Sequence, residues 1–159
     1  MEIRMDAARL VDYDRWANGR ALESIEALSP PPANAVYLLA HLLGAEVCWM
    51  DRMTAGRDPA DWERWEHMDA AAVRRAYEEE VPARWASFLA DAAASDPARA
   101  FSYVNFLGDT RSAGVEVVVL QVLLHAAYHR GQVATAVRAA GGEPAATDIL
   151  VAARAGALA

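Results

Sequence analysis

Apolar residues recur at steps of three and four along four long stretches of the chain, which is the period of a helix that buries one face. The four helices predicted in this way span about residues 5–28, 34–54, 69–95 and 115–140. Asn34 and Asp69 are candidate N-caps of the second and third helices, and Pro82 predicts a kink or break within the third. A further short helix is predicted over residues 147–159.

The segments between the predicted helices carry residues that end helices. Three consecutive prolines follow the first helix, Gly56 follows the second and Gly141 follows the fourth. Residues 57–68 are predicted to be a connecting loop, and residues 100–116 lack helical period and predict a short hairpin or loop. The chain is therefore predicted to be all-α, a four-helix bundle forming one domain over residues 1–159. Its expected arrangement is up-down-down-up, with a long crossover between the second and third helices.

The charge of the chain argues against a nucleic-acid partner. Of 159 residues, 22 are acidic and 15 are basic, and a surface with a net charge of −7 does not attract phosphate backbones. Every basic residue is arginine. The absence of lysine from the sequence excludes Schiff-base chemistry through lysine and a P-loop lysine.

Hydropathy and cysteine content predict a cytoplasmic protein without a membrane partner. Residues 1–6 lack the apolar core of a signal peptide. The most apolar run, residues 115–127, is interrupted by polar residues and is too short to span a membrane. The single cysteine, Cys48, cannot form an internal disulfide, which fits a reducing compartment.

Two histidines lie four residues apart within the fourth predicted helix. His125 and His129 are therefore about 40° apart around the helix axis, so they share one face. Their imidazoles can converge on one point, which is a compact way to supply two ligands of a divalent metal. The pair is not a zinc-protease motif, because Ala126 stands where that motif has its glutamate.

His41 is the candidate third ligand, because the second helix places it at the edge of an apolar face. If the second and fourth helices face each other, the three histidines form a site with one position left for water or substrate, as in catalytic metal sites. The alternative is that they are partly buried side chains without a ligand role. Three imidazoles suit zinc, nickel, iron or copper.

Three polar residues near the histidine pair are candidates for supporting roles. Gln121 and Gln132 lie on the histidine face, one turn to either side, which favours a polar pocket. The alternative is that these glutamines hydrogen-bond the backbone or water. Gln132 and Arg130 would orient the ligands or the substrate, although Arg130 could equally be a surface ion-pair partner.

The remaining reactive side chains have weaker sequence signals. Cys48 is a candidate fourth ligand or thiol nucleophile, against the simpler interpretation of a small apolar side chain. Asp12 and Glu46 are candidate general bases by their chemistry alone. His67, in a polar connection, is expected to be exposed.

Three segments of the chain carry a family resemblance: residues 13–18 (YDRWAN), 41–46 (HLLGAE) and 125–132 (HAAYHRGQ). Through them the chain resembles the DinB/YfiT-like family of small bacterial metal-binding four-helix bundles. The last segment is the most specific, because a histidine pair followed by Arg-Gly-Gln, with a histidine about eighty residues upstream, is the usual signature of that family. The resemblance covers essentially the whole chain.

The resemblance implies that His41, His125 and His129 hold a divalent ion, often nickel or zinc. It also implies similarity to thiol-dependent transferases that use mycothiol or bacillithiol, and to maleylpyruvate isomerases of the same fold. A low-molecular-weight thiol is therefore a candidate cosubstrate, which the metal would activate by lowering its pKa. The chain departs from the family at Tyr128, where many members have a further histidine.

Three functions are compatible with these patterns. The first is a metal-dependent enzyme acting on a small molecule, with thiol transfer favoured by the resemblance and metal-assisted hydrolysis as its alternative. The second is a non-catalytic metal or small-ligand binder, for example in stress response. The third is a structural protein whose metal links two helices. Five tryptophans and a rich apolar fraction in a small bundle also favour a homodimer.

Overall fold

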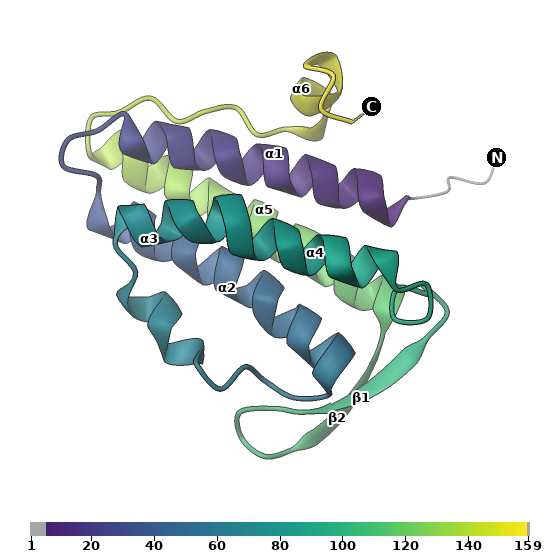
Figure 1. Cartoon of the computed structure of the whole chain (residues 1–159). Coiled ribbons are helices and arrows are strands. Elements are labelled where there is room, and N and C mark those ends of the chain that lie inside the picture. Colours follow the sequence, from purple (N-terminus) through teal and green to yellow (C-terminus); the bar gives the residue numbers. More distant parts are fainter. Residues whose placement is uncertain (1–5, 159) are drawn as a thin grey trace.

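The computed structural model describes residues 6–158 and is mostly helical, as predicted (Figure 1). Its α-helices are α1 (Ala7–Glu26), α2 (Ala33–Ala55), α3 (Ala70–Arg75), α4 (Val81–Ala90), α5 (Val115–Ala139) and α6 (Ile149–Arg154). The other elements are a 3₁₀-helix η1 (Trp62–His67), a π-helix η2 (Ala76–Glu80) and the strands β1 (Ala100–Val104) and β2 (Thr110–Gly114). Met5 and Ala159, the predicted outer ends of the first and last helices, lie outside the described residues.

Helix α2 lies at the centre of the packing. It contacts α1, α4 and, most extensively, α5. Leu39 and Leu43 are as fully buried as Leu42, so the single apolar stripe predicted for this helix was too narrow. Among residues 6–158, α2 alone is long and apolar enough to cross a membrane, and 61% of its most apolar window is buried inside the protein. A buried core helix can be as long and as apolar as a helix that crosses a membrane.

The start of α2 corrects one prediction. The N-cap is Pro32 and not Asn34, which lies inside the first turn. Pro32 has an extended backbone with φ −63° and ψ 117°, and no side chain caps the helix there. The proline ring holds φ near this value, so the chain enters the helix two residues earlier than the position of Asn34 suggested.

Residues 70–90 form one helical segment with a widened turn in its middle. Asp69 caps it as predicted, because its carboxylate accepts a hydrogen bond of 2.7 Å from the Ala72 N–H. The predicted irregularity lies just before Pro82, where the Val81 N–H donates to the Ala76 carbonyl and closes a π-helical turn. The segment ends at Ala90 and not near residue 95, because the Asp91 carboxylate accepts the N–H groups of the next turn.

The segment between α2 and α3 is not the plain loop that was predicted. It contains η1, whose Trp65 is buried against α2. Gly44 makes this contact possible, because a Cβ at residue 44 would lie 2.7 Å from Trp65 Cγ. A single short turn has no apolar period, so the sequence pattern did not reveal it. In Figure 1 the segment returns along the molecule and brings the start of α3 beside the start of α2.

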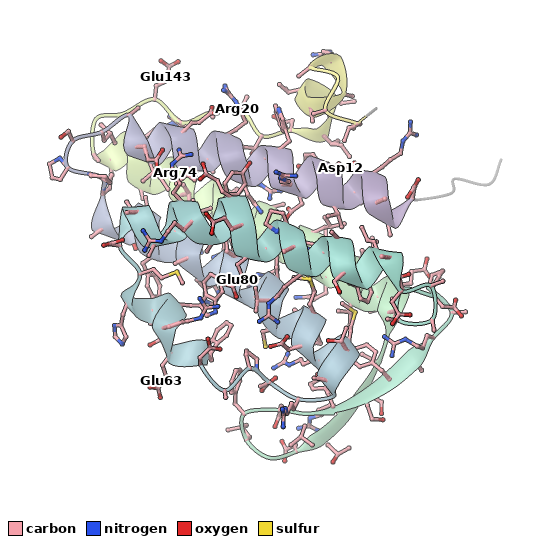
Figure 2. All side chains as sticks on the ribbon, viewed as in Figure 1. Asp12, Arg20, Glu63, Arg74, Glu80 and Glu143 are labelled. Atoms are coloured by element: carbon pink, nitrogen blue, oxygen red, sulfur yellow. The ribbon has the colours of Figure 1, made fainter. Side chains whose placement is uncertain are left out.

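Ion pairs fasten this returning segment to the helices around it. Arg64 of η1 donates to the Glu80 carboxylate at 2.5 Å. Arg74 of α3 pairs with Glu26 at the end of α1 and with Glu78 one turn further on. Figure 2 shows Arg74 and Glu80 on the helical segment that runs between α1 and η1. These ion pairs hold the helical segment of residues 70–90 against η1 and against the end of α1.

Residues 100–114 form the predicted hairpin. β1 and β2 pair antiparallel, with Phe101 opposite Ala113 and Tyr103 opposite Arg111. The hairpin is attached to the end of α2, because the Val104 N–H donates to the Gly56 carbonyl at 2.9 Å. Gly56 has φ +69°, a left-handed conformation that ends α2. The hairpin leads directly into α5.

Candidate metal centre

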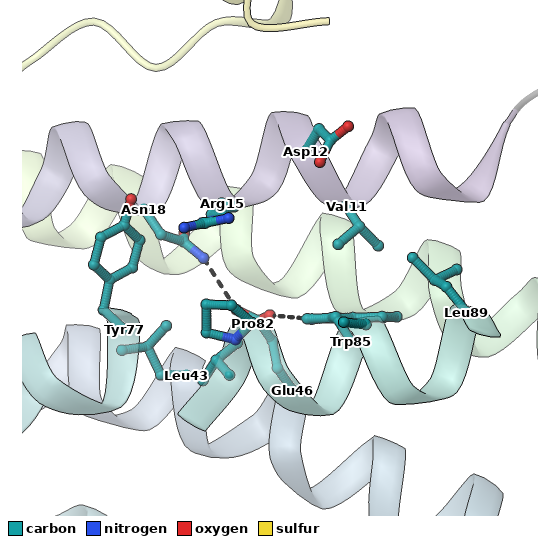
Figure 3. A pocket seen from close by; sticks show the side chains of 12 residues that line it. Val11, Asp12, Arg15, Asn18, Leu43, Glu46, Tyr77, Pro82, Trp85 and Leu89 are labelled. Atoms are coloured by element: carbon teal, nitrogen blue, oxygen red, sulfur yellow. Dashed lines mark hydrogen bonds between the residues drawn. The ribbon is translucent and has the colours of Figure 1, made fainter. Parts of the chain in front are cut away.

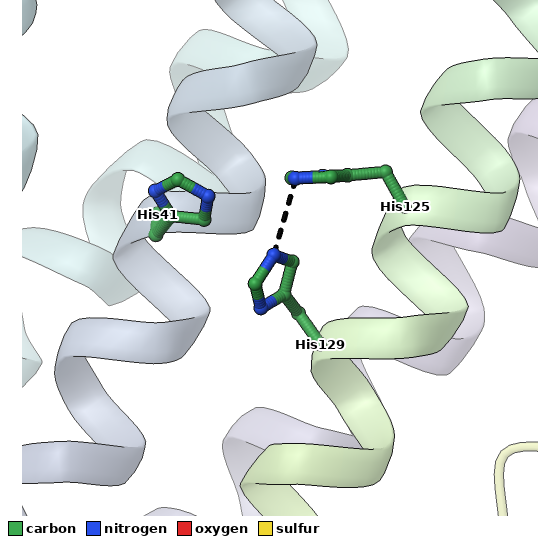
Figure 4. A group of neighbouring side chains, drawn as sticks. All are labelled: His41, His125 and His129. Carbon is green, nitrogen blue, oxygen red and sulfur yellow. Dashed lines mark hydrogen bonds between the residues drawn. The ribbon is translucent and has the colours of Figure 1, made fainter.

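The structure brings three histidines together between α2 and α5 (Figure 4). His41 projects from α2, and His125 and His129 project from α5 towards it. One ring nitrogen from each residue lies within 4.8 Å of the other two. The Nε2 atoms of His125 and His129 are 3.1 Å apart. The long contact between α2 and α5 is what places residue 41 opposite a pair more than eighty positions later in the chain.

The geometry of this histidine cluster fits a divalent metal. Zinc–nitrogen bonds of about 2.0–2.1 Å place the ligand nitrogens roughly 3–3.5 Å apart. The pair in α5 already has this spacing, and His41 is close enough to complete it with a small side-chain movement. Within residues 6–158, no cysteine or carboxylate joins the cluster. Three nitrogen donors are one fewer than a closed structural zinc site uses.

Burial keeps two of these imidazoles neutral. Burial first, and then the charges of the neighbouring His129 and His41, together lower the pKa of His125 to about 4. The pKa of His41 is lowered for the same reasons, burial first and His129 second, with a small opposing effect from Glu66. Neutral imidazoles have a free nitrogen lone pair at neutral pH. His41 and His125 can therefore bind a cation without first losing protons.

Gln132 orients one of the histidines. The His129 Nδ1–H donates to Gln132 Oε1 at 2.7 Å. This bond leaves Nε2, the nitrogen that faces His125, as the atom with the free lone pair. Gln121, predicted for a similar role, is exposed, and no hydrogen bond joins it to the histidines within the part of the chain described.

Four aromatic side chains, the aromatic rim, surround the histidine cluster. Tyr37 stacks on His41 with ring centres 6.4 Å apart, and Trp62 meets His41 edge-on at 6.3 Å. Phe106 from the hairpin connection packs on Trp62, and Tyr128 packs on His129. Tyr37, Phe106 and Tyr128 are 44%, 53% and 66% exposed. Sequence reasoning missed the rim, although Tyr37 stands one helical turn before His41.

Arg130 lies away from the histidines, in a buried polar network with Asp14, Asn18, Glu46 and Trp85. Its guanidinium Nη1 donates to Asp14 Oδ1 at 2.6 Å and to Asn18 Oδ1 at 2.7 Å. Arg130 is only 3% exposed, so the surface ion pair considered for it was wrong: the ion pair exists but is buried. The residue points to α1 because one helical step from His129 turns the side chain by about 100°.

Glu46 belongs to the same network. Its carboxylate accepts hydrogen bonds from Asn18 Nδ2 at 3.0 Å and from Trp85 Nε1 at 2.7 Å. Burial, and next the charge of Asp14, raise the pKa of Glu46 well above its ordinary value. Neither Glu46 nor the exposed Asp12 belongs to the histidine cluster, so the two candidate general bases are not placed at the candidate metal centre.

Cys48 is also separate from the histidine cluster. It is buried, and its Sγ donates to Asp58 Oδ1 at 3.6 Å. Burial raises the pKa of its thiol to about 12, which makes it a poor nucleophile at neutral pH. The sequence interpretation of Cys48 as a small buried side chain fits this environment. His67 is exposed, as expected.

Comparison with known proteins links this arrangement to one family. The sequence model of the DinB family matches residues 3–156, nearly the whole chain. No curated protein and no solved structure matches the chain.

Proposed function

The chain belongs to the DinB family, and from this premise we propose that it is a metal-dependent enzyme that transfers a low-molecular-weight thiol to a small molecule. The observation that carries the proposal is the convergence of His41, His125 and His129 without a cysteine, carboxylate or fourth histidine among them within the described residues. Three imidazoles fit nickel or zinc, and the position they leave free is where a thiol would bind. The bound ion would supply a Lewis acid that lowers the pKa of that thiol.

The placement of other groups favours thiol transfer over hydrolysis. A hydrolase of this kind needs a general base beside the metal-bound water, and no carboxylate joins the histidine cluster in residues 6–158. The chain also offers no reactive thiol of its own, because Cys48 is buried and its pKa is raised to about 12. The sulfur nucleophile would therefore come from a cosubstrate such as mycothiol or bacillithiol.

The reaction of such an enzyme can be written from its groups. The thiol gives up its proton to solvent water, its sulfur forms a bond to an electrophilic carbon of the acceptor, and the leaving group departs from that carbon with its electron pair. The chain would contribute by holding His129 through Gln132 and by offering the aromatic rim as an apolar surface for the acceptor. Exposed aromatic clusters of this kind mark binding surfaces.

Several further properties belong to the same proposal. We infer that the long helical segments form one up-down-down-up four-helix bundle, which the α2–α3 connection in Figure 1 supports. We expect a cytoplasmic protein whose partner is a small-molecule substrate and not nucleic acid or a membrane.

A homodimer is expected as well, supported by the exposed apolar side chains Val117 and Leu124 on α5. Sedimentation that shows only monomer at micromolar concentration would exclude the dimer.

Elemental analysis of protein made without an affinity tag tests the metal. Wild type is expected to hold about one nickel or zinc per chain and His125→Ala almost none. His67→Ala, which removes the exposed histidine, is the matched control and should keep its metal. No metal in wild type, even after reconstitution, would mean that the three histidines are ordinary half-buried side chains.

Cobalt-substituted protein tests the thiol. Mycothiol or bacillithiol bound at the metal should add a sulfur-to-cobalt charge-transfer band that His125→Ala does not show. Turnover of an electrophilic acceptor with either thiol would establish the transferase. Metal without any thiol response would leave the hydrolase and the non-catalytic binder as the remaining functions.

A further inference from the structure

A second candidate binding site lies between α1 and the η2–α4 segment (Figure 3). It is a cavity of about 190 Å³. Neither the histidine cluster nor the aromatic rim contributes to its lining. Most of its wall is apolar and comes from Val11, Leu43, Val81, Trp85 and Leu89. A cavity of this size is large enough for a six-membered ring, since an apolar cavity of about 150 Å³ can hold benzene.

The polar floor of the cavity has no hydrogen bonds to spare for a charged ligand. Glu46 and Asn18 line it, and each is already engaged in the buried polar network. Both Glu46 carboxylate oxygens accept hydrogen bonds, one from Asn18 and one from Trp85. Asn18 and Glu46 therefore form part of the wall, and a charged ligand would have to be recognised by other residues of the cavity.

Two donors stand together at one end of the cavity. Arg15 of α1 is exposed and takes part in none of the ion pairs found among residues 6–158. Its guanidinium is close enough to Tyr77 to lower the pKa of that hydroxyl by charge and by a hydrogen bond, against the larger raising effect of burial. Tyr77 reaches this place because Gly19 leaves room on α1: a Cβ there would lie 2.3 Å from the Tyr77 hydroxyl.

The carboxylates of Asp12 and Glu23, which lie near these two donors, form no ion pair with Arg15. Asp12 also lines the cavity, but Figure 3 shows its carboxylate directed away from it, while Arg15 lies between α1 and Pro82. Glu23, which also acts on Tyr77, is paired with Arg20 at 2.7 Å. An arginine and a tyrosine hydroxyl at the end of an apolar cavity are complementary to a carboxylate attached to an apolar body.

We propose that this cavity binds a small carboxylic acid, with its carboxylate held by Arg15 and Tyr77 and its apolar body against Trp85, Leu43 and Leu89. Arg15 and Tyr77 select the acid, because both are donors and Arg15 carries a positive charge. The lining carboxylates of Asp12 and Glu46 are directed away from the cavity or already hydrogen-bonded. The cavity limits the body to about one ring or a short branched chain. The proposal is independent of the metal chemistry at the histidine cluster, since none of its residues is shared.

Calorimetric titration with three ligands of nearly equal shape tests the proposal: benzoate, benzyl alcohol and benzylamine. Benzoate is expected to bind at least about tenfold more tightly than the other two. Arg15→Gln should weaken benzoate by about tenfold or more and leave benzyl alcohol unchanged. Arg9→Gln, the same change at an exposed position of α1 that does not line the cavity, should bind benzoate as wild type does.

Two further variants locate the bound ligand. Ala86→Phe places a ring at an exposed residue of the cavity lining and should abolish binding of all three ligands. His125→Ala should keep benzoate binding, which separates the cavity from carboxylate binding at a metal. Circular dichroism checks that every variant is folded. Equal binding of the alcohol or the amine, unchanged affinity in Arg15→Gln or Ala86→Phe, loss in His125→Ala, or no binding of benzoate would each overturn the proposal.

Discussion

The histidine cluster and the buried polar network both take residues from α2 and α5, and they differ in how far their polar groups satisfy one another. Arg130 follows His129 directly on α5, and Glu46 stands five residues after His41 on α2. In the buried network nearly every polar atom has a partner, with Nε of Arg130 as the exception. In the half-exposed cluster, the Nε2 atoms of His125 and His129 are hydrogen-bonded only to each other within residues 6–158, and a ring nitrogen of His41 converges on them.

The extent to which polar atoms are already hydrogen-bonded distinguishes a polar group that stabilises the fold from one that can bind a ligand. Polar atoms that satisfy one another in the interior fix how helices sit together and have nothing left for a ligand. Two facing imidazole nitrogens can share one proton in a hydrogen bond, whereas three that converge at a half-exposed position are all satisfied together when they bind one cation. His129 and Arg130 are adjacent on α5 and yet have different roles. One step along the helix turns the side chain by about 100°, from the histidine cluster to the buried network.

The largest expected effect comes from breaking the buried network. Arg130→Ala leaves Asp14 and Glu46 without the one buried cation found within residues 6–158, and the free energy of unfolding should fall by about 3–5 kcal/mol. Urea denaturation measures this loss. Arg138→Ala, an exposed arginine on the same helix, is the control and should cost about 0.5 kcal/mol or less. Equal losses in the two variants would show that the network does not stabilise the fold.

The histidine cluster should affect stability only when metal is present. Zinc or nickel at about one hundred times its dissociation constant should raise the free energy of unfolding of wild type by about 2.7 kcal/mol. His125→Ala should show almost no rise, and in metal-free protein it should unfold much as wild type does because the residue is half exposed. Thermal melts with and without metal measure both. A metal response retained in the variant would place the metal elsewhere.

The two clusters should give the stability of metal-free protein opposite pH dependences. The pKa of His125 is lowered from 6.5 to about 4, so between these values the unfolded chain binds a proton that the folded protein does not. Its contribution to the free energy of unfolding therefore falls as pH falls through this window. Glu46 has a raised pKa, so above its ordinary value of 4.5 the folded protein keeps a proton that the unfolded chain loses. That contribution falls as pH rises.

Two variants separate these pH dependences. Glu46→Gln should reduce the loss of stability with rising pH and leave the histidine effect. His125→Ala should reduce the histidine effect, to which His41 also contributes, and leave the effect of Glu46. Urea denaturation of each metal-free protein at several pH values between about 4 and 8 measures the slopes. If Glu46→Gln has the same pH dependence as wild type, Glu46 is ionised in the folded protein and the buried network carries a net negative charge.

The smallest expected effect concerns Cys48. Cys48→Ala removes a weak hydrogen bond to Asp58 and a few buried atoms, so the free energy of unfolding should fall by about 1 kcal/mol. Metal content should not change, because Cys48 is not a member of the histidine cluster. A fall in metal per chain would mean that the thiol is the missing fourth ligand and that the site is closed.

The elements with a long apolar period could be predicted from the sequence, and the polar core could not. On α1 the apolar period of the sequence runs through Tyr13 and Ala17, whereas Asp14 and Asn18 are buried with Ala17. A search for apolar residues rejects these two by their polarity. Their spacing of four, in line with the buried Ala21 and Ile25, was the available signal.

The residues around the histidine cluster could not be predicted from the sequence for a different reason. His125 and His129 share a face by local geometry alone, but the approach of His41 depends on how α2 packs against α5. Trp62 and Phe106 reach the cluster from connecting segments that have no period of their own. Such contacts arise from tertiary packing, which the spacing of residues along the chain does not encode.

The π-helical turn η2 makes residues 70–90 one residue longer than a regular helix with the same two ends. In an ordinary helix, losing a residue turns every later side chain by about 100° and destroys the packed face. Here, removal of Glu79 would instead let α3 and α4 join as one regular helix, with Val73 and Trp85 still directed inward. The widened turn is thus a place where the length of this chain can change by one residue while its core stays in register.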